Sequence, residues 1–381
     1  MQPRTSVYMD YAATSPLWPE VRAAMAPYLD DRYANASSIY AAAREARKAI
    51  EEARETIASA VGARPDEVIF TSGGTEADNI AVQGVAFRAR NEGRDGIVVS
   101  AIEHHAVLDT ARWLGRNGYR VTEVGVDVDG VIDEIALRAA VDRKTAIVSV
   151  MTANNEVGSI QPVALCAEIA RAAGARFHTD AVQALPWIPI DAAEADLIAL
   201  AAHKVGGPKG VGALIVRRGV GVEPLVHGGG QERGLRSGTY NVAGIAGFGA
   251  AVEATRAARE QLVPRVRALR DRLQEALVEK ISGVTVNAAK AERLPNNCNV
   301  CIDGIESEPL LLLLDAAGIA ASSGSACQSG AAEASHVLTA MGVPKDRAMG
   351  ALRLTLGRDT SPDDVDTVVQ HVVAGVERLR R

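Results

Sequence analysis

Two side chains in this sequence have the chemistry of covalent catalysts. Lys204 follows a strand-like apolar run that ends near Leu200 and precedes Gly206-Gly207-Pro208, a setting typical of a cleft. Burial depresses the pKa of a lysine amine and permits Schiff-base chemistry. Cys327 is a single thiol among serines, glycines and alanines. A structural cysteine normally packs among larger apolar residues, so this pattern favours an accessible, reactive thiol.

A glycine pair between a strand and a helix indicates an anion site. Phe70-Thr71-Ser72-Gly73-Gly74-Thr75 leads from an apolar strand into a helix that we expect to begin near Thr75. Glycines let a backbone approach an anion, and the free N–H groups at a helix start favour phosphate. A simple glycine turn with a threonine cap explains the same residues equally well.

Two further strand ends carry titratable side chains. Asp180 follows Phe177-His178-Thr179, where a carboxylate needs a cation or a donor. A protonated pyridine nitrogen is one such cation, and a helix N-cap is the alternative. In Glu103-His104-His105, one histidine could stack on a planar cofactor and move protons, with a structural histidine pair as the alternative.

Arg353 lies in an alternating segment from Ala351 to Gly357, which predicts a strand with its leucines on one face. Arginine fixed on a strand is a bidentate clamp for a carboxylate, and a structural ion pair is equally consistent with the pattern. Cys298 and Cys301 form a C-x-x-C, but on a strand they point to opposite faces and cannot share a metal. We therefore expect no metal site.

The elements that position these residues follow an α/β pattern. Short, nearly continuous apolar runs alternate with helical stretches from about residue 16 to 258, which predicts a largely parallel sheet covered on both faces. A long charged helix from Ala251 to Ile281 then leads to a smaller α+β region. We expect a large domain at 15–255 and a small domain formed by 1–14 and 256–381.

Composition excludes several functions. The net charge of −6 makes nucleic acid or an anionic membrane an unexpected partner. The N-terminus lacks an apolar core of signal-peptide length, and the longest apolar run, Leu310 to Leu314, is too short to span a bilayer. We expect a cytoplasmic protein.

In order along the chain, these motifs resemble the cysteine desulfurases, a family of fold-type-I pyridoxal-phosphate enzymes within the class-V aminotransferases. The resemblance runs from Tyr8-Met9-Asp10-Tyr11-Ala12-Ala13-Thr14 to Arg353-Leu354-Thr355-Leu356-Gly357-Arg358. It includes Asn154-Asn155-Glu156-Val157-Gly158 and the segment from Gly228 to Thr239. Ser322-Ser323-Gly324-Ser325-Ala326-Cys327 is similar to the long-loop group of nitrogen-fixation and iron–sulfur-cluster type.

The resemblance implies a fold with a mostly parallel seven-stranded sheet and a smaller C-terminal α+β domain. It also implies an activity: pyridoxal 5'-phosphate-dependent removal of sulfur from L-cysteine, giving L-alanine and a persulfide on Cys327 for an acceptor protein. Lys204 would bond the cofactor and then move protons, and His104 would stack on its ring and take part in proton transfer. Asn155 and Arg353 would grip the substrate carboxylate.

The remaining roles implied by the resemblance concern cofactor binding. Asp180 would pair with the pyridine nitrogen and Gln183 with the phenolic oxygen. The phosphate would be held by Gly74, Thr75 and His203. Thr239 would reach the phosphate of a neighbouring subunit, which implies a homodimer with shared active sites.

The sequence departs from the family pattern in three places. Ala201 replaces a serine that donates to the phosphate in most relatives, and Asn35-Ala36-Ser37-Ser38-Ile39-Tyr40 differs at the site entrance. The chain ends at Arg381, without the extension that engages a scaffold protein in the cluster-assembly type, so the acceptor stays open. Selenocysteine lyase, another class-V transaminase and a non-catalytic sulfur-relay subunit are the alternatives, although Cys327 argues against a transaminase.

Overall fold

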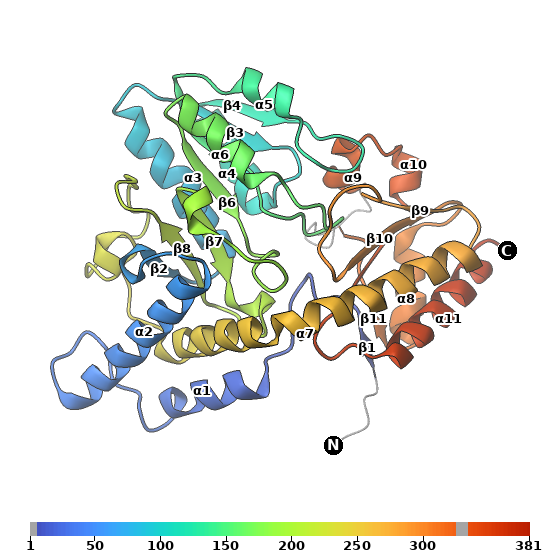
Figure 1. Cartoon of the computed structure of the whole chain (residues 1–381), viewed down its shortest axis with the longest axis horizontal. Helices are drawn as coiled ribbons and strands as arrows, with labels where there is room; N and C mark the ends of the chain where they lie inside the picture. The colour runs from blue at the N-terminus through green and yellow to red at the C-terminus, as the bar shows by residue number, and fades with distance from the viewer. Residues whose placement is uncertain (1–5, 325–333) are drawn as a thin grey trace.

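The computed structural model describes residues 6–324 and 334–381, and a seven-stranded sheet is their central element (Figure 1). Its strands lie in the order β2-β8-β7-β6-β5-β3-β4. Strand β8 is antiparallel to both neighbours and the other pairs are parallel. The strands are β2 (Val68–Thr71), β3 (Gly96–Ser100), β4 (Arg120–Val124), β5 (Thr145–Ser149), β6 (Arg176–Asp180), β7 (Leu197–Ala201) and β8 (Gly212–Val216). The predicted fold class is confirmed.

Helices cover both faces of this sheet. Successive strand residues therefore pack into different apolar clusters. On β7, Leu197 and Ala199 pack with α3 (Gly74–Arg90) and α4 (His105–Arg116). Ile198 and Leu200 belong instead to the cluster that includes α2 (Ala41–Ala60) and α6 (Val163–Ala172). Two-sided burial explains why the strands read as continuous apolar runs.

The C-terminal part has an antiparallel sheet in the order β12-β10-β9, formed by β9 (Val284–Val286), β10 (Asn297–Ile302) and β12 (Ala351–Thr355). A separate pair joins β1 (Val7–Tyr8) to β11 (Ile319–Ala320) in parallel. The N-terminal strand therefore belongs to the small sheets, and its partner strand β11 is distant from it in sequence. The helices in this part are α8 (Ser307–Ala316), α9 (His336–Ala340), α10 (Lys345–Ala348) and α11 (Pro362–Leu379).

One helix links the two sheets. Helix α7 (Val242–Lys280) starts nine residues before the predicted bridging helix and runs beneath both regions (Figure 1). The N-terminal half buries glycines and alanines against α1 (Pro19–Leu29) and α2, which allows close helix packing. The predicted division at residue 255 falls inside this helix and stays a prediction. None of the helices in residues 6–324 and 334–381 has the length and apolar character to cross a membrane.

Candidate active site

Lys204 ends the short 3-10 helix η3 (Ala202–Lys204), directly after β7. Its Nζ donates to the carbonyl oxygens of Ala12 at 2.5 Å and Ala13 at 2.8 Å. The segment that carries these carbonyls is fixed by Ser15, whose Oγ donates to His203 O and accepts from Gly206 N. The amine is therefore held by backbone oxygens about 190 residues away in sequence. By contrast, Lys209 is exposed, as its turn sequence predicts.

Asp180 ends β6, the strand that pairs with β7, and Lys204 follows β7. One carboxylate oxygen accepts from Val182 N at 2.8 Å, which leaves the second for another partner. Burial raises the pKa of Asp180 to about 6, although Val182 N–H and the Lys204 ammonium oppose this shift. A cationic partner would restore full ionisation of this carboxylate. Gln183, three residues on, donates to the Ala12 carbonyl at 2.9 Å.

His104 and His203 are both neutral at pH 7. Burial, with Lys204 nearby, lowers the pKa of each imidazole to about 4. His104 caps α4, and its Nδ1 accepts from Ala106 N at 3.1 Å, so the ring proton lies on Nε2. Nδ1 of His203 lies 3.1 Å from Thr14 Oγ1. The hydrogen-bond donor of the His104 ring is thus Nε2.

The glycine turn has the geometry of an anion site. Helix α3 starts at Gly74 after the N-cap Gly73, which makes no side-chain cap hydrogen bond. A Cβ at Gly74 would lie 2.9 Å from Val182 Cγ2, so a side chain here would force a shift against the segment that follows β6. Thr75 is exposed in the first turn. The threonine-cap alternative is wrong, because the N-cap residue is Gly73.

Arg353 is buried on β12, with its guanidinium at the junction of three segments. It donates to Asn155 O at 3.0 Å and to Asp10 Oδ1 at 2.8 Å. Its buried Nε has no hydrogen-bond partner among the described residues. The arginine thus makes an ion pair and still has a donor available for a ligand. The three leucines of this segment, Leu352, Leu354 and Leu356, all enter the core.

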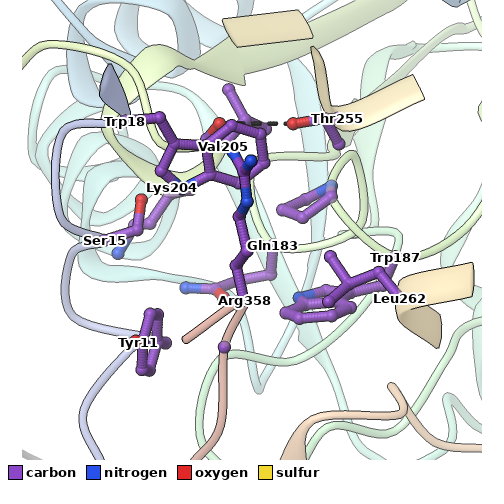
Figure 2. Close-up of a pocket in the computed structure, with 12 residues that line it drawn as sticks. Tyr11, Ser15, Trp18, Gln183, Trp187, Lys204, Val205, Thr255, Leu262 and Arg358 are labelled. Atoms are coloured by element: carbon purple, nitrogen blue, oxygen red, sulfur yellow. Dashed lines mark hydrogen bonds between the residues drawn. The ribbon is translucent and has the colours of Figure 1, made fainter. Parts of the chain in front are cut away.

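Figure 2 shows a small cavity on one side of Lys204, lined by Trp18, Trp187 and Arg358 among others. The Arg358 guanidinium stacks over the Trp18 ring, 4.4 Å from its centroid. The cavity volume of about 20 Å³ suits about one water molecule and is too small for an amino acid.

Of the remaining predicted site residues, one lies outside the described part of the chain and one lies on an exposed loop. Cys327 lies outside the described residues. Thr239 is exposed on the loop after the 3-10 helix η4 (Glu232–Gly234). Cys298 and Cys301 enter different apolar clusters, which confirms that they face opposite ways, and the described residues contain no group of three side chains suited to a metal ion.

Sequence reasoning missed the carbonyls of Ala12 and Ala13. Tyr8 to Thr14 stood out only as a motif, because backbone oxygens carry no residue-type signal. A second omission lies behind Asp180, where His178 Nε2 is 3.5 Å from Asp78 Oδ1 and its Nδ1 is 2.8 Å from Ser149 Oγ. All three side chains are buried. A polar residue inside an otherwise apolar strand was the available signal.

These residues fit pyridoxal phosphate. The uncapped start of α3 offers N–H donors to a phosphate, and Asp180 has a carboxylate oxygen available for a ring nitrogen. Lys204 lies just beyond the end of the neighbouring strand, β7. The orphaned Nε of Arg353 is suited to the carboxylate of an amino acid.

The sheet, the lysine after β7 and the buried aspartate on β6 define an α/β enzyme of the aminotransferase class, and the family model described as Aminotransferase class-V matches residues 7–368. The chain is 48% identical over 377 residues to the cysteine desulfurase IscS of Methanosarcina thermophila, covering 98% of this chain and 93% of that protein. A solved NifS-like protein has a TM-score of 0.92 at 36% identity, covering 98% of this chain and 100% of that one.

A structure named SspA in complex with cysteine has a TM-score of 0.81 at 34% identity, covering 92% of this chain and 99% of that one. The chain therefore belongs to the class-V aminotransferase family and, within it, to the cysteine desulfurases. The predicted family is confirmed. The individual roles of the site residues stay predictions.

Proposed function

We propose that this chain uses pyridoxal phosphate to remove sulfur from L-cysteine, producing L-alanine and a persulfide on Cys327. The observation that carries the proposal is the cleft in which the Lys204 amine, Asp180 and the uncapped helix start converge at the ends of β6, β7 and β2. The names of the relatives support the substrate, since they are cysteine desulfurases and one related structure holds cysteine.

The cofactor, when bound, supplies an electron sink for the bonds around the substrate Cα. Lys204 would hold it and then, with its amine released, move a proton at Cα. Asp180 would keep the ring nitrogen protonated, Gln183 would donate to the phenolic oxygen, and His104 would stack on the ring. Gly74, Thr75 and His203 would hold the phosphate.

Arg353 and Asn155 would orient the substrate by its carboxylate. The Cys327 thiolate then attacks the substrate sulfur. The sulfur–sulfur bond forms as the Cβ–sulfur bond breaks, and the electron pair left on carbon takes up a proton to give the methyl group of alanine. A relay through His104, which passes on its Nε2 proton as the ring takes up another, is the route we assign to this proton.

We also propose a homodimer. The described surface exposes large apolar side chains close together in sequence at the end of α1 and the start of α2, namely Leu29, Tyr33, Ile39 and Tyr40. Clustered apolar exposure of this kind marks interaction surfaces. Thr239 is exposed in its own chain, which suits a role in the partner's phosphate site.

The persulfide would pass to an acceptor protein, with iron–sulfur-cluster assembly as the destination suggested by the relatives named IscS. We place this step in the cytoplasm. L-cysteine, the partner subunit and the acceptor are the proposed partners, with neither nucleic acid nor membrane directly involved.

Two variants test the proposal. Lys204→Ala is expected to abolish the visible absorbance of the bound cofactor and to lower turnover by about a thousandfold or more. Cys327→Ser is expected to change the cofactor spectrum on addition of cysteine yet release no sulfide. Full turnover by Cys327→Ser would overturn the persulfide assignment, and comparing cysteine, selenocysteine and alanine as substrates separates the related activities.

A further inference from the structure

Glu156 is a buried acid that none of the roles above uses. Its side chain is only 3% exposed, and it follows Asn155 directly. The backbone around it is fixed by amide side chains that are themselves buried. Glu156 N donates to Asn154 Oδ1 at 2.8 Å, and Glu156 O accepts from Asn297 Nδ2 and Asn299 Nδ2, each at 3.0 Å. A buried carboxylate is costly unless it is well partnered, so its contacts indicate its purpose.

The Glu156 carboxylate lies between residues on both sides of the segment 325–333. On one side, Ser335 Oγ donates to Glu156 Oε2 at 2.5 Å, and His336 Nδ1 lies 3.9 Å from Oε1. On the other side, Gly324 packs so closely that a Cβ there would lie 2.8 Å from Oε2. One carboxylate therefore lies against the last residue before that segment and accepts a hydrogen bond from the second residue after it.

The same network reaches the predicted substrate grip. Ser322, two residues before Gly324, exchanges backbone hydrogen bonds with Arg353 on β12. Arg353 in turn donates to the carbonyl of Asn155, the neighbour of Glu156. Contacts thus run from Arg353, the residue proposed to hold the substrate carboxylate, to Gly324 before the segment 325–333 and to Ser335 after it.

We propose that Glu156 is a positioning residue for sulfur transfer. Through Gly324 and Ser335 it fixes the chain before and after the segment that contains Cys327, and it holds both relative to Arg353. The inference rests on the proposed function, because it assumes that Cys327 receives the sulfur. The proposed site consists of described residues alone. Glu156 touches neither cofactor nor substrate and acts through the residues it holds.

Glu156→Gln tests this directly, since it keeps the shape and the backbone bonds but removes the anionic acceptor of Ser335. We expect kcat for alanine formation to fall about tenfold, with KM for cysteine within about twofold of wild type. Ser335→Ala should cause a similar fall, and the double variant should be no slower than either single variant by more than about twofold. Glu168→Gln, an exposed change on α6, is the matched control.

Two further readouts separate positioning from loss of structure. In a single turnover, Glu156→Gln is expected to form the Cys327 persulfide about tenfold more slowly, with an unchanged cofactor spectrum on binding cysteine. Gly324→Ala should reproduce this, because the new methyl group displaces the carboxylate. Gly342→Ala is its control, since both glycines have positive φ (+97° and +77°) but a Cβ at Gly342 has no neighbour within 4 Å.

The possible outcomes distinguish failure of this inference from failure of the proposed function. An unchanged kcat in Glu156→Gln, additive losses in the double variant, or equal effects of the two glycine changes would overturn the inference. If Cys327→Ser keeps full turnover, the proposed function itself fails. If Cys327→Ser is inactive while Glu156→Gln behaves as wild type, only the role of Glu156 is wrong.

Discussion

The cleft at the ends of β6 and β7 and the small-sheet face that carries Arg353 treat charge in opposite ways. In the cleft, burial lowers the pKa values of His104 and His203 to about 4 and raises that of Asp180 to about 6. On the small sheet, Arg353 forms an ion pair with Asp10 at 2.8 Å. Buried groups whose pKa values are shifted are typical of sites that move protons, whereas a fixed ion pair orients a charged ligand. In the proposed roles, proton transfer is thus separated from substrate recognition.

Arg353→Lys is the largest expected break in this comparison. Lysine keeps the positive charge but loses the planar fork that reaches Asp10, Asn155 and a ligand together. We expect KM for cysteine to rise on the order of tenfold to a hundredfold, with a smaller change in kcat. Steady-state kinetics measures both constants. Arg347→Lys, an exposed change beside Asp303, should leave them unaltered, and a fall in kcat alone would assign Arg353 to the chemistry instead.

His104→Asn sharpens the comparison from the side of the cleft. Unfolded histidine has a pKa near 6.5, and burial lowers that of folded His104 to about 4. Between these pH values the unfolded chain binds a proton that the folded chain does not, so stability falls as the pH drops from about 6.5 toward 4. Asparagine can still accept from Ala106 N as a helix cap but does not titrate.

Relative to wild type, His104→Asn should therefore become more stable at low pH by on the order of 1–3 kcal/mol between pH 6.5 and 4. Urea unfolding at several pH values measures this difference. His371→Asn, an exposed change on α11, is the surface control. A difference between His104→Asn and wild type that does not vary with pH would show that His104 is not held neutral.

The sequence predicts this molecule well where side chains carry the signal locally. Local patterns define the helices Ala41–Ala60, Val163–Ala172 and Pro362–Leu379, through apolar periodicity and, at the start of the last, a proline. Lys204, Asp180 and Gly74 were also visible locally, since each lies at the end of an apolar strand or within three residues beyond it.

The rest depends on contacts between segments distant in sequence. Nothing in Ala12 or Ala13 shows that its carbonyl will accept from Lys204, and nothing in Glu156 shows that Ser335 will donate to it across 179 residues. The start of α7 was also missed, because its first turns are rich in glycine and alanine and lack a charged face. Tertiary packing decides these features rather than local pattern.

Ala201→Ser has the smallest expected effect and tests whether the cleft is complete on its phosphate side. Ala201 is 1% exposed at the end of β7, and its Cβ lies 3.7 Å from the position of a Cβ at Gly74. A hydroxyl at 201 would therefore face the glycine turn and could donate to a phosphate held there.

One added hydrogen bond of about 1 kcal/mol corresponds to about fivefold tighter cofactor binding. Cofactor release measured by dialysis and absorbance checks this, with KM for cysteine expected to be unchanged because Arg353 is untouched. Equal affinity in both proteins would mean that the N–H groups of α3 and His203 already satisfy the phosphate, and that the loss of the serine cost this chain nothing.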